Sequence, residues 1–494
     1  MADSLVTVMA PNDDASACVT FELRGRDLAL VPPAALWPLD DDTLCAALAG
    51  PDEAAGARAL LTRDRRGRFL RARPMDFPRL RDAVRAHGAY PVRVAFDESP
   101  LLPVPPEVAV TPRPYQEDAL MAWRAAGFAG VVVLPTGAGK TVLGALAIAD
   151  LGLRTLVVVP TIDLLRQWRV ALLHALRLPE EHVGVFGGGD HEVAPVTVIT
   201  YESAQLHPEL LRHFGLLIFD ECHHLPAPTY RQIAEGAFTP NRLGLSATPE
   251  RADLEHVALR RLVGPEVYRR APEELAAARY LAAYDAHRVP VRLSDDEQAH
   301  YDAARAVYRE YIRRHRIAIA GPGDFQRKVL WASARNADAR EAMLAWREAR
   351  HLALNAPAKL ALLEDLFARH AGERVLVFSE FNSVVEAISD RFAIPAITHK
   401  TPPDERRAIL DRFRAGRYTK LASGRVLNEG VDIPDCGVAV IVSGTATRRE
   451  YIQRLGRILR PKETRAVLYE LVTEGTSEER VSERRRGQHQ GKEA

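Results

Sequence analysis

The sequence lacks several features that would place it in a simpler class of protein. Its four cysteines, at positions 18, 45, 222 and 436, lie far apart and form no Cys-x-x-Cys pair, which argues against a zinc or iron–sulfur centre and favours a reducing compartment. No apolar run is long enough to cross a bilayer, and the N-terminus lacks the basic start and apolar core of a secretion signal. We therefore expect a cytoplasmic protein with no membrane partner.

An excess of charge of one sign is also lacking. The chain has 494 residues, of which 66 are basic and 65 are acidic, so any nucleic-acid binding has to come from local grooves and not from a basic body. Lysine is scarce, at seven of the 66 basic residues. The length leaves room for about three domains, and a hydrophobic content of 47% is enough for several cores.

The strongest positive signal is a phosphate-binding loop. Residues 131–134 are apolar and mostly β-branched, which predicts a buried strand, and residues 142–150 carry apolar side chains at helical spacing. The loop between them consists of Pro135, Thr136, Gly137, Ala138, Gly139, Lys140 and Thr141. Its glycines let backbone N–H groups converge on an anion at the start of the helix. We expect Lys140 to reach the β- and γ-phosphates and Thr141 to hold Mg²⁺.

This loop departs from the general pattern at its first position, where Leu134 stands in place of a glycine. The alternative interpretation is a glycine-rich surface turn with a chance lysine. The flanking strand and helix, together with the scarcity of lysine, argue against it.

A pair of carboxylates is the second strong signal. Asp220 and Glu221 follow the apolar segment 216–219, which predicts a strand that delivers them to the edge of a sheet where ligands bind. We expect Asp220 to hold Mg²⁺ and Glu221 to orient or deprotonate the attacking water. His223 completes an Asp-Glu-x-His box. A metalloprotease would need His-Glu-x-x-His on a helix, and that spacing is absent.

Other polar residues lie at the starts of predicted helices and the ends of predicted strands. Arg113 and Gln116 open a helix before the phosphate loop, and an amide that both donates and accepts is suited to reading the edge of adenine. Three further strands end in hydroxyl residues, which are Thr161, Thr200, Ser246 and Thr248. Short hydroxyls can hold a sugar-phosphate backbone, although each of these residues is equally well explained as a helix cap.

The second half of the chain predicts a helical hairpin and another α/β unit. A helix that begins at Ser294 carries a line of arginines at helical spacing, namely Arg305, Arg309, Arg313 and Arg316. The line can follow phosphates, or it can be an ordinary solvated face. Residues 334–354 predict a partner helix. From residue 375 strands and helices alternate again, and Gln453, Arg457 and Arg460 share one helical face that suits a γ-phosphate.

The N-terminal region predicts a small α+β module. Turn residues centred on Gly25 and Gly67 suggest two hairpins, over residues 19–31 and 60–72, followed by a helix over 77–87 and a strand over 90–96. A proline-rich stretch at 99–106 then predicts a stiff linker. These patterns do not specify a function for the module.

In order and content, these motifs resemble superfamily 2 helicases. The segments 219–227, 395–399 and 450–461 are similar to the XPB branch of that superfamily. The resemblance implies an ATP-dependent 3'-to-5' DNA translocase or helicase that acts in repair, sometimes beside a nuclease. It also implies two RecA-like lobes with ATP between them, arginine fingers at Arg457 and Arg460, and further ATP-site residues at His223, Gly430 and Asp432.

The same resemblance assigns the strand-end hydroxyls, Arg251 and Asp253 to DNA contact, and the helical line of arginines adds Arg305 and Arg309 as predicted contacts. The family's Arg-Glu-Asp loop reads here as Arg251-Ala252-Asp253, which puts a strand-separating role for that loop in question.

The predicted fold class is α/β, with two RecA-like parallel-sheet lobes, a small N-terminal α+β domain and a helical thumb insertion. The expected domains are a damage-recognition-like domain at 1–105, an ATP-binding lobe at 106–270, a linker and thumb at 271–355, a second lobe at 356–476 and a polar tail at 477–494. We expect a monomer that uses ATP and Mg²⁺ and acts on DNA.

Three other functions remain open from the sequence. The chain could be an RNA-dependent ATPase, the motor subunit of a restriction system, or a nucleotide-binding scaffold that recruits a nuclease. The lesion and the choice between unwinding and translocation alone are not specified by these motifs.

Overall fold

The computed structural model describes residues 18–64, 69–247, 255–278, 280, 284–318, 326–424, 436–443, 466–479 and 482. The chain divides into two compact units, residues 1–134 with 139–269, and residues 135–138 with 270–494. Among the described residues, no helix combines the length and the apolar character needed to span a bilayer.

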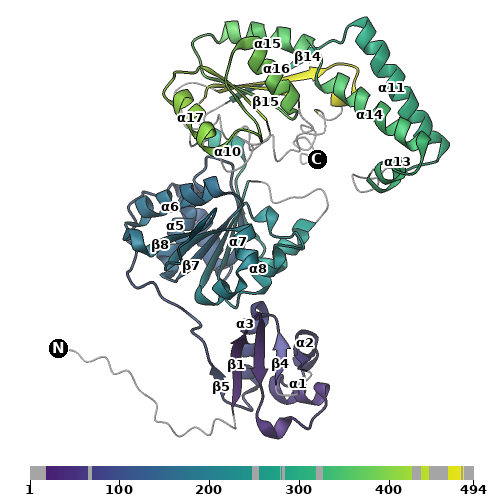
Figure 1. Cartoon of the computed structure of the whole chain (residues 1–494). Helices are drawn as coiled ribbons and strands as arrows, with labels where there is room; N and C mark the ends of the chain where they lie inside the picture. Colours follow the sequence, from purple (N-terminus) through teal and green to yellow (C-terminus); the bar gives the residue numbers. More distant parts are fainter. Residues whose placement is uncertain are drawn as a thin grey trace. The chain divides into compact units, whose positions relative to one another are not determined.

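The first unit begins with a small five-stranded sheet, which confirms the predicted α+β module (Figure 1). Both predicted hairpins form, and Gly25 makes the first turn at a φ of 61°. The sheet has the order β3-β4-β2-β1-β5, with β5 parallel to β1. Its elements are β1 (Val19–Arg24), β2 (Asp27–Val31), α1 (Asp41–Ala49), α2 (Ala54–Leu60), β3 (Thr62–Arg63), β4 (Leu70–Ala72), α3 (Phe77–His87) and β5 (Val92–Val94).

The core of this module is completed by a residue from further along the chain. Phe238 is buried in the same cluster as Phe21 and Phe77, and its ring centroid lies 4.9 Å from that of Phe96. Arg73 adds an ion pair of 2.6 Å to Glu235. Burial of an aromatic side chain gives a large hydrophobic stabilisation, so the loop before β12 holds the module within the first unit.

The rest of the first unit is an eight-stranded sheet with the order β13-β6-β12-β11-β7-β10-β8-β9, parallel except for the β8–β9 pair. The strands are β6 (Ala129–Val133), β7 (Thr155–Val159), β8 (Val183–Gly187), β9 (Asp190–His191), β10 (Val196–Thr200), β11 (Leu216–Asp220), β12 (Arg242–Ser246) and β13 (Glu266–Arg269). The helices are α4 (Pro114–Ala125), α5 (Lys140–Leu151), α6 (Ile162–Leu176), α7 (Tyr201–Leu206), α8 (Arg231–Glu235) and α9 (Leu259–Leu262).

Helices cover both faces of this sheet, as parallel strands that are apolar throughout require. The α7, α8 and α9 side chains share one buried cluster with alternate residues of the central strands. On the other face α5 packs on α6, where Gly144 lets the Trp168 ring approach so closely that an added Cβ would lie 2.6 Å from it. The parallel strands place their carboxyl ends along one edge, where ligands bind in folds of this type.

The second unit contains a six-stranded parallel sheet with the order β14-β19-β18-β15-β17-β16. Residues 284–291, which the sequence groups with the linker and thumb, form β14 and pair with β19. The strands are β14 (Tyr284–Val291), β15 (Val375–Ser379), β16 (Ala396–Ile397), β17 (Lys420–Ser423), β18 (Val438–Ser443) and β19 (Ala466–Thr473). The helices beside them are α10 (Pro272–Ala277), α15 (Ala358–Arg369), α16 (Asn382–Phe392) and α17 (Pro403–Arg414).

A helical hairpin projects from this sheet as the predicted thumb (Figure 1). It consists of α11 (Asp295–Arg314), η7 (Gln326–Leu330), α13 (Trp331–Ser333) and α14 (Ala337–Leu354). Ser294 and Glu297 form the capping box that begins α11. The buried Tyr301 and Tyr311 pack on alanines of α14. The predicted line of arginines is wrong at its last member. The helix α11 ends at Arg314, and Arg316 lies beyond it with a φ of 48°.

Candidate functional site

The phosphate loop adopts the backbone conformation that its glycines predict. Gly137 and Gly139 have φ values of 84° and 75°, a backbone conformation that residues other than glycine rarely adopt. Gly139 is the N-cap of α5, so Lys140 and Thr141 lie in its first turn. The Thr136 hydroxyl is buried and has no hydrogen-bond partner among the described residues. The loop thus presents a helix N-terminus, two glycines and a buried polar atom, which together fit a phosphate group.

Gln116 lies directly against this loop. Its Oε1 accepts a hydrogen bond from the backbone N–H of Arg113 at 2.9 Å, and its Nε2 donates to the carbonyl of Gly139 at 3.2 Å. A side-chain amide both donates and accepts hydrogen bonds, and these two bonds orient the Gln116 amide against the phosphate loop. A Cβ on Gly139 would lie 2.5 Å from Nε2, which explains why that position has no side chain.

Lysine and acid meet at the centre of the site. Nζ of Lys140 donates to Oε1 of Glu221 at 3.2 Å, and the two side chains are 10% and 12% exposed. The residues are 81 positions apart and are brought together because β6 and β11 end at the same edge of the sheet. Glu221 has a left-handed backbone, with φ 46° and ψ 51°. Strain of this kind concentrates at functional sites.

Asp220 is held by three neighbours. Its Oδ2 accepts from Nε1 of Trp168 at 2.7 Å, and its Oδ1 accepts from the backbone N–H of Glu221 at 3.0 Å. The Tyr201 hydroxyl donates to the backbone carbonyl of Asp220 at 3.1 Å. Trp168 and Tyr201 are residues whose contacts to Asp220 the sequence did not predict, because no local pattern indicates a bond between separate elements.

The electrostatics of Asp220 fit a cation. Burial, helped by the neighbouring charge of Glu221, raises the pKa of Asp220 to about 6, while Lys140 and the Trp168 hydrogen bond act in the opposite direction. No cluster of three or more metal-ligating His, Cys, Asp or Glu side chains occurs among the described residues. Magnesium in nucleotide sites needs only one or two protein oxygens besides phosphates and water. Asp220 and the Thr141 hydroxyl meet that requirement and could hold Mg²⁺ there.

His223 joins the acidic pair to β12. Its Nδ1 lies 3.1 Å from Oγ of Ser246 and 3.4 Å from Oε2 of Glu221, and the ring is fully buried. Ser246 is also fully buried. Its hydroxyl therefore faces the interior of the lobe, and the DNA contact at Ser246 stays a prediction. The arrangement suits communication between Glu221 and the end of β12.

Two predicted DNA contacts act as helix caps. The Thr161 hydroxyl accepts from the backbone N–H of Leu164 at 3.3 Å and begins α6. The Thr200 hydroxyl accepts from the backbone N–H of Ser203 at 3.2 Å and begins α7. Both caps lie at the carboxyl ends of parallel strands, so the capping role and a position near a ligand coexist.

On the thumb, Arg305 is half-buried beside the ring of Tyr308, with its Cζ 5.9 Å from the ring centroid. Arg309 is exposed. Several other predicted site residues lie outside the described residues and stay predictions, namely Thr248, Arg251, Asp253, Gly430, Asp432, Gln453, Arg457 and Arg460.

The sequence matches two family models. Residues 109–251 match the type III restriction enzyme res subunit, and residues 358–462 match the helicase conserved C-terminal domain. The chain is 42% identical over 375 residues to the DNA 3'-5' translocase XPB2 of Sulfurisphaera tokodaii, covering 76% of this chain and 84% of that one. It is 34% identical over 360 residues to the DNA 3'-5' helicase XPB of Mycobacterium tuberculosis, covering 71% of this chain and 58% of that one.

Solved structures support the fold. The helicase domain of Pyrococcus furiosus Hef matches with a TM-score of 0.54 at 18% identity, covering 76% of this chain and 98% of that one. Saccharomyces cerevisiae Dbp5 bound to RNA and ADP BeF3 matches with a TM-score of 0.52 at 14% identity, covering 76% of this chain and 87% of that one.

Two parallel-sheet lobes, a glycine loop ending in lysine and an adjacent acidic pair define a superfamily 2 helicase, an enzyme class that depends on ATP. Within that class, the extent and identity of the match to the archaeal translocase decide the family. The chain belongs to the XPB family of DNA 3'-5' helicases and translocases.

Proposed function

We propose that the chain hydrolyses ATP and uses the free energy to move along DNA with 3'-to-5' polarity, in DNA repair. The contact between Lys140 and Glu221, at 3.2 Å, carries this proposal. It joins the group suited to the γ-phosphate to the group suited to activating water. The named activities of the archaeal and mycobacterial relatives supply the polarity and the choice of DNA.

In this mechanism Lys140 exchanges Glu221 for the β- and γ-phosphates when ATP binds, which releases the Glu221 carboxylate to act on water. Thr141 and Asp220 would hold Mg²⁺, which when bound would supply positive charge to the phosphate oxygens. Gln116, whose side-chain amide can both donate and accept, contacts the adenine edge. Arg457 and Arg460, predicted from the sequence to meet the γ-phosphate, complete the set.

The test is DNA-stimulated ATP hydrolysis by the full chain. Lys140→Ala should lose nucleotide affinity and turnover, whereas Glu221→Gln should still bind ATP but fail to hydrolyse it. Arg124→Gln is a matched control, because it removes an exposed ion-pairing charge, to Asp150, from the same lobe. Normal turnover in either Lys140→Ala or Glu221→Gln would refute the assigned roles.

The rival functions are separated by substrate and by movement. DNA should stimulate the ATPase more strongly than RNA of equal length. An RNA-dependent ATPase would show the reverse order. Displacement of a triplex-forming strand reports movement, which a nucleotide-binding scaffold lacks. A forked duplex with each overhang polarity then distinguishes unwinding from translocation alone. We further propose a monomer, sometimes acting beside a nuclease, and sedimentation tests the oligomeric state.

A further inference from the structure

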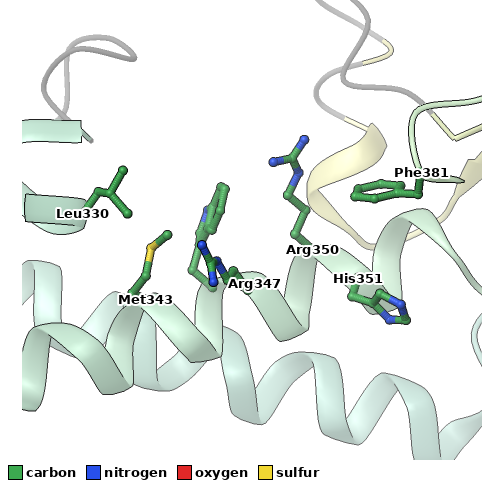
Figure 2. A pocket seen from close by; sticks show the side chains of 7 residues that line it. Leu330, Met343, Arg347, Arg350, His351 and Phe381 are labelled. Carbon is green, nitrogen blue, oxygen red and sulfur yellow. The ribbon is translucent and has the colours of Figure 1, made fainter. Parts of the chain in front are cut away.

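A cavity of about 410 Å³ lies within the second unit, between the thumb and the end of β15. Figure 2 shows its lining: Arg347, Arg350 and His351 project from one helix, and Phe381 faces them from another segment. That helix is α14, and Phe381 follows β15 by two residues. Trp346, Leu330 and Met343 complete the lining. We call this cavity the aromatic pocket.

Two aromatic rings and a guanidinium group define the aromatic pocket. The Cζ of Arg350 lies 5.3 Å from the ring centroid of Trp346 and 5.8 Å from that of Phe381. Arg350 also pairs with Glu380 at 3.2 Å, and the Glu380 side chain is only 7% exposed. Because cation–π contacts and a partly buried ion pair both hold Arg350, the guanidinium group beside the two rings is held in place before any ligand arrives, which lowers the entropy cost of binding.

Two exposed apolar side chains are sequence neighbours of residues that line the aromatic pocket. Trp331, next to Leu330, is 61% exposed, and Leu344, next to Met343, is 57% exposed. Large apolar side chains of this kind mark interaction sites when they cluster. The half-buried Trp346 adds a ring face, and the exposed Arg347 adds a cationic group beside the exposed His351. A ring face beside cations matches the chemistry of a nucleobase attached to phosphates.

The position of the aromatic pocket agrees with that chemistry. Phe381 lies just beyond the carboxyl end of β15, where Oγ of Ser379 and Oγ of Ser443 are 2.7 Å apart at the ends of neighbouring strands. Ligands of parallel α/β sheets bind at this edge. A ligand in this site would therefore contact both the thumb, through α14, and the second lobe, through the segment after β15.

We propose that the aromatic pocket binds one base of a single DNA strand, in contact with the ring of Trp346, while the adjoining phosphate lies at Arg347. The inference rests on the proposed DNA motor function and adds a base contact to a mechanism otherwise built on phosphate contacts. It requires no sequence preference, because every base has a π face.

The experiment compares two strands of equal length and charge, one of oligothymidylate and one made of abasic sites, binding to the full chain. Wild-type protein should bind the base-bearing strand about 5-fold to about 150-fold more tightly, the effect expected for one stacked base. Trp346→Leu should lose that preference, and Trp346→Phe should retain part of it. Arg347→Gln should weaken both strands equally and lower the salt dependence by about one phosphate contact.

Trp37→Leu is the matched control, because Trp37 also stacks under an arginine, with the Cζ of Arg63 at 5.4 Å, but in the N-terminal module. It should leave the base preference intact. A preference that survives in a folded Trp346→Leu protein, or is absent from the wild type, would overturn the inference while leaving the motor intact. Failure of the wild type to bind either strand would instead overturn the motor function itself. Self-association abolished by Trp346→Leu would identify a second copy as the occupant, and would also overturn it.

Discussion

The indole Nε1 of Trp168 donates a hydrogen bond of 2.7 Å to Oδ2 of Asp220, and both residues are buried. Trp168 lies on α6, which begins at the Thr161 cap, and Tyr201, which bonds to the backbone of Asp220, begins α7 after the Thr200 cap. The helices α6 and α7, whose cap residues are predicted to contact DNA, therefore each supply a side chain that is hydrogen-bonded to Asp220. Asp220 is the residue suited to holding Mg²⁺. Residues that orient a metal ligand tune the affinity of the site.

Trp168→Phe should weaken Mg²⁺-dependent nucleotide binding by about 10-fold, because an outer hydrogen-bond partner of a metal ligand typically has an effect of that order or greater. The indole atoms nearest Gly144, Cη2 and Cζ3, are also lost, so a second Trp-to-Phe substitution serves as the control. The measurement is a Mg²⁺ titration of fluorescent ADP binding, which does not depend on turnover.

The control for this substitution is Trp123→Phe. Nε1 of Trp123 donates to the carbonyl of Arg242 at 2.9 Å, and Trp123 is fully buried in the same lobe. Both substitutions should lower the free energy of unfolding by about 1 kcal/mol for the lost hydrogen bond. Only Trp168→Phe should change the Mg²⁺ dependence of ADP binding. An equal change in both variants would show that Trp168 acts only through packing.

Gly139→Ala should impair nucleotide binding severely. The substitution places a Cβ 2.5 Å from Nε2 of Gln116 at a φ of 75°, and a left-handed alanine alone costs about 1–2 kcal/mol. Gly152 caps the other end of α5 at a φ of 61°, with nothing within 4 Å of an added Cβ. Gly152→Ala should thus lose similar stability but keep its nucleotide affinity. Equal nucleotide affinities in the two variants, measured by titration, would show that Gly139 serves only the backbone.

Ser246→Ala should uncouple DNA from hydrolysis. The change removes the hydroxyl that contacts His223, which in turn contacts Glu221, but it leaves Lys140, Thr141 and the glycines of the phosphate loop in place. DNA stimulation of the ATPase should fall by about 2-fold to about 30-fold, the range for residues that carry coupling, with little change in the KM for ATP. Thr197→Val, which removes a buried hydroxyl bonded to the Ala194 carbonyl, should leave the stimulation unchanged. A uniform loss of basal and stimulated rates in Ser246→Ala would contradict the coupling role.

The phosphate loop and the acidic pair could be predicted from the sequence because their chemistry is local. Gly137, Gly139 and Lys140 need only a strand before them and a helix after them, and hydrophobic periodicity predicts both. The meeting of Lys140 with Glu221 follows from the rule that parallel strands end at a common edge.

The remaining features depend on packing that periodicity does not encode. Trp168 and Asp220 are 52 positions apart, and their bond depends on how α6 lies on the sheet. The segment 284–291 joins the second sheet only through β19, whose partner residues begin at Ala466. The short helices α1 and α2 are rich in alanine and have a weak helical pattern, so their local signal is small. The aromatic pocket combines two segments in the same way, Trp346 from a helix and Phe381 from a strand end.

A buried ion pair in the second unit provides the last prediction. Nζ of Lys359 lies 2.8 Å from Oε2 of Glu478, and the side chains are 1% and 2% exposed. Glu478 also accepts from the backbone N–H of Thr473 at 2.9 Å. Burial raises the pKa of Glu478 above its usual 4.5, although Lys359 and the Thr473 hydrogen bonds oppose that change. The pair therefore ties α15 to the segment after β19.

Lys359→Met should lower the free energy of unfolding by about 3–5 kcal/mol at pH 8, because it leaves the Glu478 carboxylate buried without a counter-charge. A carboxyl whose folded pKa is raised loses stability as the pH rises from 4.5 through that pKa, so the deficit of Lys359→Met should shrink at pH 5, where Glu478 takes up a proton. Lys420→Met, which removes a lysine that donates to the carbonyls of His370 and Glu373, should show a deficit that changes little between pH 5 and 8. Denaturant titrations at both pH values measure this, and a deficit in Lys359→Met that is the same at both would mean that Glu478 stays ionised after its partner is removed.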